Sequence, residues 1–445
     1  MKAHRYTFLL TLVLALALAM VAAGCGGDDD DEGGGEGAAT TGGEAAAGVS
    51  GDISILALWT SGEQASFEAV LDGFKEANPD VNISYKSAED VAPVLSTAIQ
   101  GGNPPDIAAV PNPGLMRQFV ESGDLKDIEF ARDTVEKNFS KSWVDLASVD
   151  NKLYGVFFKG ANKSTVWYNV HAYEDAGIEP AEDWDAFVQN AETLKQSGVP
   201  AWSIGGADGW TLTDWFENVY IRLAGPEKYD ELTEHKIPWT DQSVKDTLKE
   251  LQKVFGDSDN IAGGTNGALQ ADFPTSVTNV FANLTQPKAA TVYEGDFVSG
   301  VILDETKAKP NTDFNVYDFP AVNGSDPAVV GGGDMIVMFK DNPAAKALVE
   351  YLATPEAATI WVKRGGFSSP NKSVNADDYP DEILKSTATA LANADTFRFD
   401  LSDLQPSAFG GDAMFTILQG FLKNPDDVDG TADKLEAAAK QAYGS

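Results

Sequence analysis

The side chains that this sequence offers for chemistry are mainly carboxylates, amides and aromatic rings. Its 445 residues include 68 acidic residues and nine tryptophans, but a single cysteine, Cys25. Only two histidines, His171 and His235, follow that cysteine. This inventory leaves little for a disulfide, a thiolate metal cluster or a histidine-based triad. No G-x-S-x-G, H-E-x-x-H or P-loop pattern is present either. Hydrogen bonding and ring stacking are the interactions that remain.

Charge and length limit the partners and the architecture. The formal charge is -36, from 32 basic and 68 acidic residues. Such a chain repels nucleic acid and anionic lipid, so any attachment to a membrane must be hydrophobic or covalent. Domains usually run to about 100–200 residues, so a chain of this length exceeds one simple core. We expect two lobes with additional tails.

The N-terminus has the pattern of an export signal. Lys2 and Arg5 precede an apolar run over 8–20, which is too short to span a bilayer. The run ends in a segment that resembles a bacterial lipobox, with Ala22 where leucine is more usual and Cys25 at the position that is lipidated. We therefore predict a lipoprotein signal peptide over 1–24 and a lipid anchor on Cys25. The alternative is ordinary cleavage that leaves a free thiol.

Residues 25–50 predict a flexible tether. They are mostly glycine, alanine and acidic residues, including the acidic run 28–32, and nothing before Val49 could start a core. A self-repelling segment of this composition does not fold alone. Calcium binding by the acidic run is the alternative, although no glycine turn spaces its ligands.

Beyond the tether, apolar runs typical of strands alternate with amphipathic helical patterns. This alternation predicts an α/β fold with mainly parallel sheet. The predicted strands are 53–58, 81–85, 105–110, 154–158, 164–169, 277–284, 290–293, 316–319 and 335–339.

Several motifs, in this order along the chain, are similar to one family. They are 55–74, 102–107, 154–156 with 167–169, 204–215, 293–297, 332–334, 351–356 and 365–367. Together they resemble the extracellular solute-binding proteins of carbohydrate ABC importers, and the later segments resemble the α-glucoside-binding branch. The resemblance implies a type II-like periplasmic-binding-protein fold with a hinge and a ligand cleft. It also implies an N-lobe over 51–158 and 333–372 and a C-lobe over 162–329 and 376–445.

Sugar recognition needs aromatic platforms together with carboxylates and amides. The resemblance implies ligand contacts at positions spread along both lobes, namely Glu63, Gln64, Asn112, Lys159, Trp210, Asp214, Trp215, Glu294, Asp296, Phe297, Asp334 and Asp403. Structural alternatives remain open for several of them. Gln64 could cap a helix, Trp215 could be helix core, and 294–297 could be a simple acidic turn. Lys159 could equally be a solvated surface residue.

Three functions follow as hypotheses. The first is a monomeric, non-enzymatic receptor that captures a carbohydrate such as an α-glucoside, without a cofactor or metal, and delivers it to ABC permease subunits. The second is a receptor for an amine or a peptide, because cation receptors also combine rings with acids. The third is an exported glycoside hydrolase with two carboxylates. So many acidic residues make carboxylate pairs unavoidable, so their presence does not favour the hydrolase.

Overall fold

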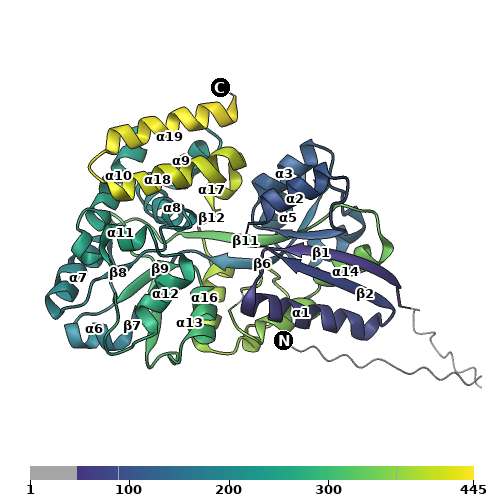
Figure 1. The fold of residues 1–445 in the computed structure, drawn as a ribbon, viewed down its shortest axis with the longest axis horizontal. Helices are drawn as coiled ribbons and strands as arrows, with labels where there is room; N and C mark the ends of the chain where they lie inside the picture. Colours follow the sequence, from purple (N-terminus) through teal and green to yellow (C-terminus); the bar gives the residue numbers. More distant parts are fainter. Residues whose placement is uncertain (1–47, 89, 367, 445) are drawn as a thin grey trace, which may run out of the picture. The chain divides into compact units, whose positions relative to one another are not determined.

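The computed structural model describes residues 48–88, 90–366 and 368–444. The predicted signal peptide, Cys25 and almost all of the predicted tether lie outside these residues. The described chain forms one folded unit that contains two large sheets and one two-stranded sheet. Elements of both lobes are labelled in Figure 1.

The first sheet contains the strands predicted near the start of the folded region. Its order is β12-β11-β3-β1-β2, and β6 also pairs with β11. β1 is parallel to β2 and β3, whereas β11 is antiparallel to β3 and β6. The strands are β1 (Gly51–Ala57), β2 (Val81–Ser87), β3 (Ile107–Val110), β6 (Gly155–Asn162), β11 (Val329–Met338) and β12 (Phe397–Phe399).

Helices that bury apolar faces against this sheet complete the first lobe. Apolar residues of these helices and of the sheet share one core, which includes Phe67, Leu95, Met116 and Trp361. The elements are α1 (Ser61–Ala77), α2 (Val91–Gln100), α3 (Pro113–Glu121), η1 (Glu129–Ala131), α4 (Arg132–Asn138), α5 (Lys141–Leu146), the small pair β4 (Ser148–Val149) and β5 (Lys152–Leu153), α14 (Pro343–Leu352) and α15 (Pro355–Val362).

The second sheet has the order β10-β7-β9-β8. Its strands are β7 (Thr165–Asn169), β8 (Trp202–Ser203), β9 (Thr291–Glu294) and β10 (Phe314–Asp318). The central β7 is antiparallel to both of its neighbours. A helix-rich layer surrounds it, made of α6 (Val170–Ala176), α7 (Trp184–Ser197), α8 (Trp210–Ala224), α9 (Pro226–Thr233), α10 (Gln242–Phe255), η2 (Ser258–Asn260), α11 (Gly264–Ala268), α12 (Phe273–Phe281), α13 (Val298–Glu305), α18 (Met414–Lys423) and α19 (Val428–Tyr443).

The predicted α/β, two-lobed fold is confirmed. The sheets are mixed rather than mainly parallel, because β11 pairs antiparallel with β3 and β6, and β7 pairs antiparallel with β9 and β10. The predicted strand over 277–284 is wrong. That segment is mostly α12, which begins where Asp272 accepts a hydrogen bond from the Thr275 N–H and Pro274 stands in the first turn. Val277, Val280 and Phe281 are all buried. Their spacing of three and four residues places them on one helical face, whereas the short apolar run by itself did not distinguish helix from strand.

Two paired strands lead from the first sheet toward the second. β6 and β11 run side by side in the middle of Figure 1, and their pairing continues from Gly155 opposite Val337 to Asn162 opposite Gly331. β6 then leads into β7 of the second sheet. β12 pairs with the first residues of β11, although it lies within residues predicted for the second lobe. The exact lobe boundaries stay a prediction.

Shorter elements complete the chain between the lobes. α16 (Glu382–Asn393) packs on both β6 and β11, and α17 (Leu401–Leu404) contacts α3 and α9. A three-residue turn, η3 (Ala376–Asp378), precedes α16, and a π-helix, η4 (Phe409–Ala413), precedes α18.

Asp106 joins three elements of the first lobe. Its Oδ2 accepts from the Ser54 N–H at 2.8 Å, and its Oδ1 accepts from Asn342 Nδ2, at the start of α14, at 3.2 Å. Partial burial opposes ionisation, but the bonds from Ser54 and Asn342 outweigh it and lower the pKa of Asp106. The carboxylate therefore stabilises the packing of β1, β3 and α14 in its charged form.

We expect Asp106→Ala to lower the free energy of unfolding by about 1 kcal/mol at pH 7, because it leaves partly buried donors without an acceptor. The pKa of Asp106 is lower in the folded protein than in the unfolded chain, where it is about 4. Its contribution to stability is therefore complete above the unfolded pKa and is lost as pH falls through the folded pKa. In urea unfolding, the difference between the variant and the native protein should therefore shrink as pH falls below about 4. Asp80→Ala, at an exposed turn, is the control; a deficit for Asp106→Ala that stayed constant with pH would contradict the assignment.

Candidate functional site

The pairing of β6 with β11 brings Lys159 opposite Asp334, next to a bulge between Asp334 and Met335. Lys159 Nζ donates to Glu63 in the first turn of α1 and lies 3.9 Å from Asp334 Oδ2. The indole Nε1 of Trp59, just after β1, donates to Asp334 Oδ2 at 2.6 Å. We call Trp59, Glu63, Lys159 and Asp334 the Lys159 cluster. It joins side chains from three separate parts of the first lobe.

Buried charge determines the protonation of this cluster. Lys159 is 8% exposed. Burial lowers its pKa, but Glu63 and Asp334 outweigh burial, so the pKa of Lys159 is raised overall. Burial raises the pKa of Asp334 to about 6, although Lys159 opposes this. The alternative that Lys159 is a solvated surface residue therefore does not hold.

A second lysine four residues later organises a larger group of acids. Lys163 Nζ lies 3.2 Å from Asp214 Oδ1 of α8 and also donates to Asp400, which follows β12. Burial lowers the pKa of Lys163, but Asp214 and Asp400 raise it well above its ordinary value. Asp403 of α17 also acts on that pKa. We call Lys163, Asp214, Glu294, Asp400 and Asp403 the Lys163 cluster.

The acids of this cluster do not share one protonation state. Burial raises the pKa of Asp214 to about 7, with Lys163 opposing, and raises the pKa of Glu294 and of Asp403 well above the usual range. Burial also acts on Asp400, but Lys163 outweighs it and lowers the pKa of that carboxyl. One lysine cannot neutralise several buried carboxylates, so some of them hold protons at neutral pH.

Aromatic rings connect the two clusters. The ring centroids of Trp210, Phe273 and Phe297 lie 5.2–6.0 Å apart. Lys159 Nζ lies 5.6 Å from the Phe297 centroid, and Lys163 Nζ lies 5.3 Å from that of Trp210. Both distances suit a cation–π contact. Side chains of both lobes therefore form one continuous array of rings, carboxylates and ammonium groups.

Asp296 lies beside this array and joins two segments of the chain through hydrogen bonds. Its carboxylate accepts from the Asn162 N–H at 3.2 Å and from the Ser368 hydroxyl, so it fastens the end of β6 to the segment that precedes α16. Burial raises its pKa to about 6. Gly295 lets Phe297 fold back over this turn, since a side chain there would meet the Phe297 ring.

Three predicted residues lie outside the array. Trp215 is 1% exposed and packs on Tyr293 and Phe319 in the core of the second lobe. This position agrees with the alternative that Trp215 is helix core. The Asn112 side chain caps α3 by accepting from the Leu115 N–H. Gln64 bonds to Glu68 and Ser87 at the surface.

Trp59, Lys163, Phe273 and Asp400 belong to the array but were absent from the residues predicted above. Trp59 and Lys163 each follow the end of a strand, and this is the one local signal that could have indicated them. Asp400 reaches Lys163 only because β12 pairs with β11, which is a contact between distant segments.

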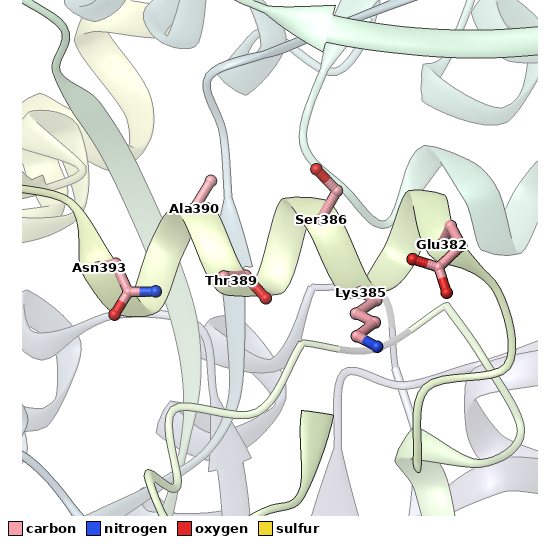
Figure 2. A pocket seen from close by; sticks show the side chains of 6 residues that line it. All are labelled: Glu382, Lys385, Ser386, Thr389, Ala390 and Asn393. Atoms are coloured by element: carbon pink, nitrogen blue, oxygen red, sulfur yellow. The ribbon is translucent and has the colours of Figure 1, made fainter. Parts of the chain in front are cut away.

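The hollow shown in Figure 2 does not coincide with the array. It lies along α16 and is lined by Glu382, Lys385, Ser386, Thr389, Ala390 and Asn393. None of these side chains is aromatic, and none belongs to either cluster. We locate the candidate site at the array, where the buried charges and rings gather, and not at this hollow.

Two further observations concern the described residues. No group of three or more histidine, cysteine or acidic side chains among them is arranged to hold a metal ion. No helix among them combines the length and apolar character needed to cross a membrane.

Comparisons with known proteins match most of the chain. The family model described as bacterial extracellular solute-binding protein matches residues 59–359. An alpha-glucosides-binding periplasmic protein from Rhizobium meliloti is 31% identical over 400 residues, which cover 86% of each chain. An osmoprotective compounds-binding protein from Synechocystis sp. is 28% identical over 391 residues, covering 85% of this chain and 91% of its own.

Solved structures agree on the fold. A bacterial solute receptor described as preferring β-D-galactopyranose superposes with a TM-score of 0.78 at 18% identity, covering 88% of this chain and 99% of its own. The match in sequence covers more than half of the chain, and the fold agrees with it. The chain therefore belongs to the bacterial extracellular solute-binding proteins, and it is a receptor rather than an enzyme.

Proposed function

We propose that this protein captures a carbohydrate outside the cytoplasm and delivers it to an ABC importer. The observation that carries the proposal is the array itself, in which the Trp210 and Phe297 rings lie beside buried carboxylates and lysines of both lobes. Rings pack on the apolar C–H faces of a sugar, while carboxylates and ammonium groups bond to its hydroxyls. An α-glucoside is the ligand class that we favour, because the Rhizobium relative binds alpha-glucosides.

The ligand contacts in this proposal come from both clusters. From the first lobe they are Glu63, Lys159 and Asp334, with Trp59 beside them. From the second they are Trp210, Asp214, Glu294 and Phe297, with Lys163, Asp296 and Asp403 around them. Capture involves closure of the lobes about the β6 and β11 crossover, which turns binding of a small ligand into a movement that a permease can recognise.

The proposal also includes an anchor. Lipidation of Cys25 would hold the receptor at the membrane through a tether of roughly 25 residues, whose r.m.s. span is about 25–30 Å. Each buried CH₂ of the lipid contributes about 0.8 kcal/mol, so two or more chains anchor stably. A receptor held in this way stays near the permease subunits that it serves.

Titration calorimetry with glucose, maltose, trehalose, sucrose, raffinose and a quaternary amine tests the ligand class. We expect at least one sugar to bind and the amine not to bind. Binding of the amine alone would favour the second hypothesis, and turnover of a disaccharide would support the hydrolase.

Ring truncation tests the site. We expect Trp210→Ala and Phe297→Ala each to weaken sugar binding by about tenfold to a hundredfold, because each removes apolar contact area. Phe130→Ala is the matched control, since this ring is 38% exposed in the first lobe, outside the array. Circular dichroism checks that the variants fold. Unchanged affinity in both ring variants would remove the array from the ligand site.

The anchor is tested by Cys25→Ser expressed in a bacterial host. We expect the native protein to sediment with membranes and to gain the mass of a diacylglyceryl cysteine in mass spectrometry. The serine variant should be found in the soluble fraction without that mass. A native protein that carries a free thiol at its mature N-terminus would instead support ordinary signal cleavage.

A further inference from the structure

Two buried acids of the Lys163 cluster have oxygens that receive no hydrogen bond from a protein N–H or O–H group. These atoms are Asp214 Oδ2 and both Glu294 oxygens, Oε1 and Oε2. Asp214 is fully buried and Glu294 is 2% exposed. Buried carboxylates without donors are rare in folded proteins, because losing water without replacement costs free energy. Each such oxygen therefore needs an explanation.

The closeness of the two side chains supplies part of that explanation. Tyr293, which precedes Glu294 on β9, donates to the Asp214 backbone carbonyl at 3.0 Å, and the charge of Asp214 acts on Glu294. Two buried carboxyl groups that lie close together are more stable with one shared proton than with two negative charges. Burial and the charge of Asp214 raise the pKa of Glu294 well above its usual range, which favours Glu294 as the proton carrier. One proton does not satisfy all of these oxygens, so lone pairs on both carboxyl groups remain without a donor.

Other charged groups face this pair from every element around it. Lys163 follows β6, Asp400 follows β12, and Tyr293 precedes Glu294 on β9. The titratable neighbours whose charges act on the pair or on its contacts include Lys163, Glu217, Arg222, Tyr293, Asp400 and Asp403. Lys163 contacts the pair directly, with its Nζ 3.2 Å from Asp214 Oδ1.

We propose that Asp214 and Glu294 share one proton in the ligand-free protein and release it when hydroxyl groups of a ligand donate to their open oxygens. This inference rests on the proposed function, because it needs a hydroxyl-bearing ligand at the array. No covalent bond changes: the ligand hydroxyls keep their protons, and the shared proton passes to the buffer. The bound ligand then faces two carboxylates, which accept its hydroxyls.

The same geometry selects a neutral ligand. The ammonium group of Lys163 already lies over the Trp210 ring and against Asp214 and Asp400, where a cationic ligand would bind. The open oxygens of Asp214 and Glu294 still lack hydrogen-bond donors, and neutral donors would fill this need without adding a second positive charge beside Lys163. A polyol such as a sugar supplies several hydroxyl donors in one rigid frame, and it meets the need of all three oxygens.

The sign of the pH dependence follows from the proton count. Hydroxyl donors favour the ionised form of a carboxyl, so the pKa of the pair is lower in the complex than in the free protein. The complex therefore holds fewer protons, and affinity increases with pH between those two pKa values. The slope reaches about tenfold per pH unit where one full proton is released.

Calorimetry with the tightest-binding sugar of the panel, in phosphate and in Tris buffers, measures this proton directly. We expect release that approaches one proton near neutral pH, seen as a difference in apparent heat between buffers, and affinity that increases from pH 5.5 to 8. Binding with no proton release and no pH dependence would overturn this inference and leave the proposed function intact. Failure of every sugar to bind would overturn both.

Glu294→Gln locates the proton. The amide donates hydrogen bonds as a protonated carboxyl does but has no proton that titrates, so we expect proton release near zero and pH-independent affinity. Asp214→Asn, measured in parallel, removes the other partner and should have the same effect on release. Thermal unfolding of each variant, with and without sugar, checks that it folds and binds. Release that persists in both variants would overturn the assignment.

Glu217→Gln is the matched control. Burial raises the pKa of Glu217 as well, but its oxygens accept from Tyr229, Leu401 and Ser402. We expect this variant to release the same fraction of a proton as the native protein. If Glu217→Gln abolished release while Glu294→Gln retained it, the proton would belong to Glu217 and our proposal would be wrong.

Discussion

The candidate site depends on the burial of two lysines against an excess of carboxylates where β6 and β11 pass between the sheets. Lys159 and Lys163 lie four residues apart, and each bonds to acids from different segments. Buried charge is stable only when it is paired, so each lysine determines where its partner segments lie. The strand pairing and these ion pairs thus reinforce each other, and the rings of Trp210 and Phe297 are held beside the two ammonium groups.

The arrangement separates residues that hold the fold from residues that could bind a ligand. Asp296 and Glu217 direct their oxygens to donors of the protein, and their burial serves the joining of distant segments. Asp214 and Glu294 belong to the same neighbourhood yet leave three oxygens without a protein donor. Unsatisfied buried groups cost stability, and a protein that keeps them commonly uses them. In our proposal, this contrast separates the acids that would contact a ligand from those that hold the fold.

Much of the fold was predictable from the sequence because it is local. Alternating strands and amphipathic helices predicted the α/β lobes, and Asn342 with Pro343 starts α14 as a cap and first-turn proline. The order of weak motifs indicated the family, and the family match confirms it. The prediction of a strand over 277–284 was wrong because a short apolar run fits both the helical and the strand repeat of apolar residues. The cap at Asp272, which begins α12, favours the helix.

The sequence by itself therefore determined the class of the chain: its acidity, its scarcity of cysteine and histidine, its lobes and its family. Only the tertiary structure decided which side chains meet. Lys163 contacts Asp400, 237 residues away, and Trp215 is core while Trp210 is in the array, although they are neighbours on one helix. The physical reason is that burial and charge pairing depend on contacts between distant segments, which neither composition nor local periodicity contains.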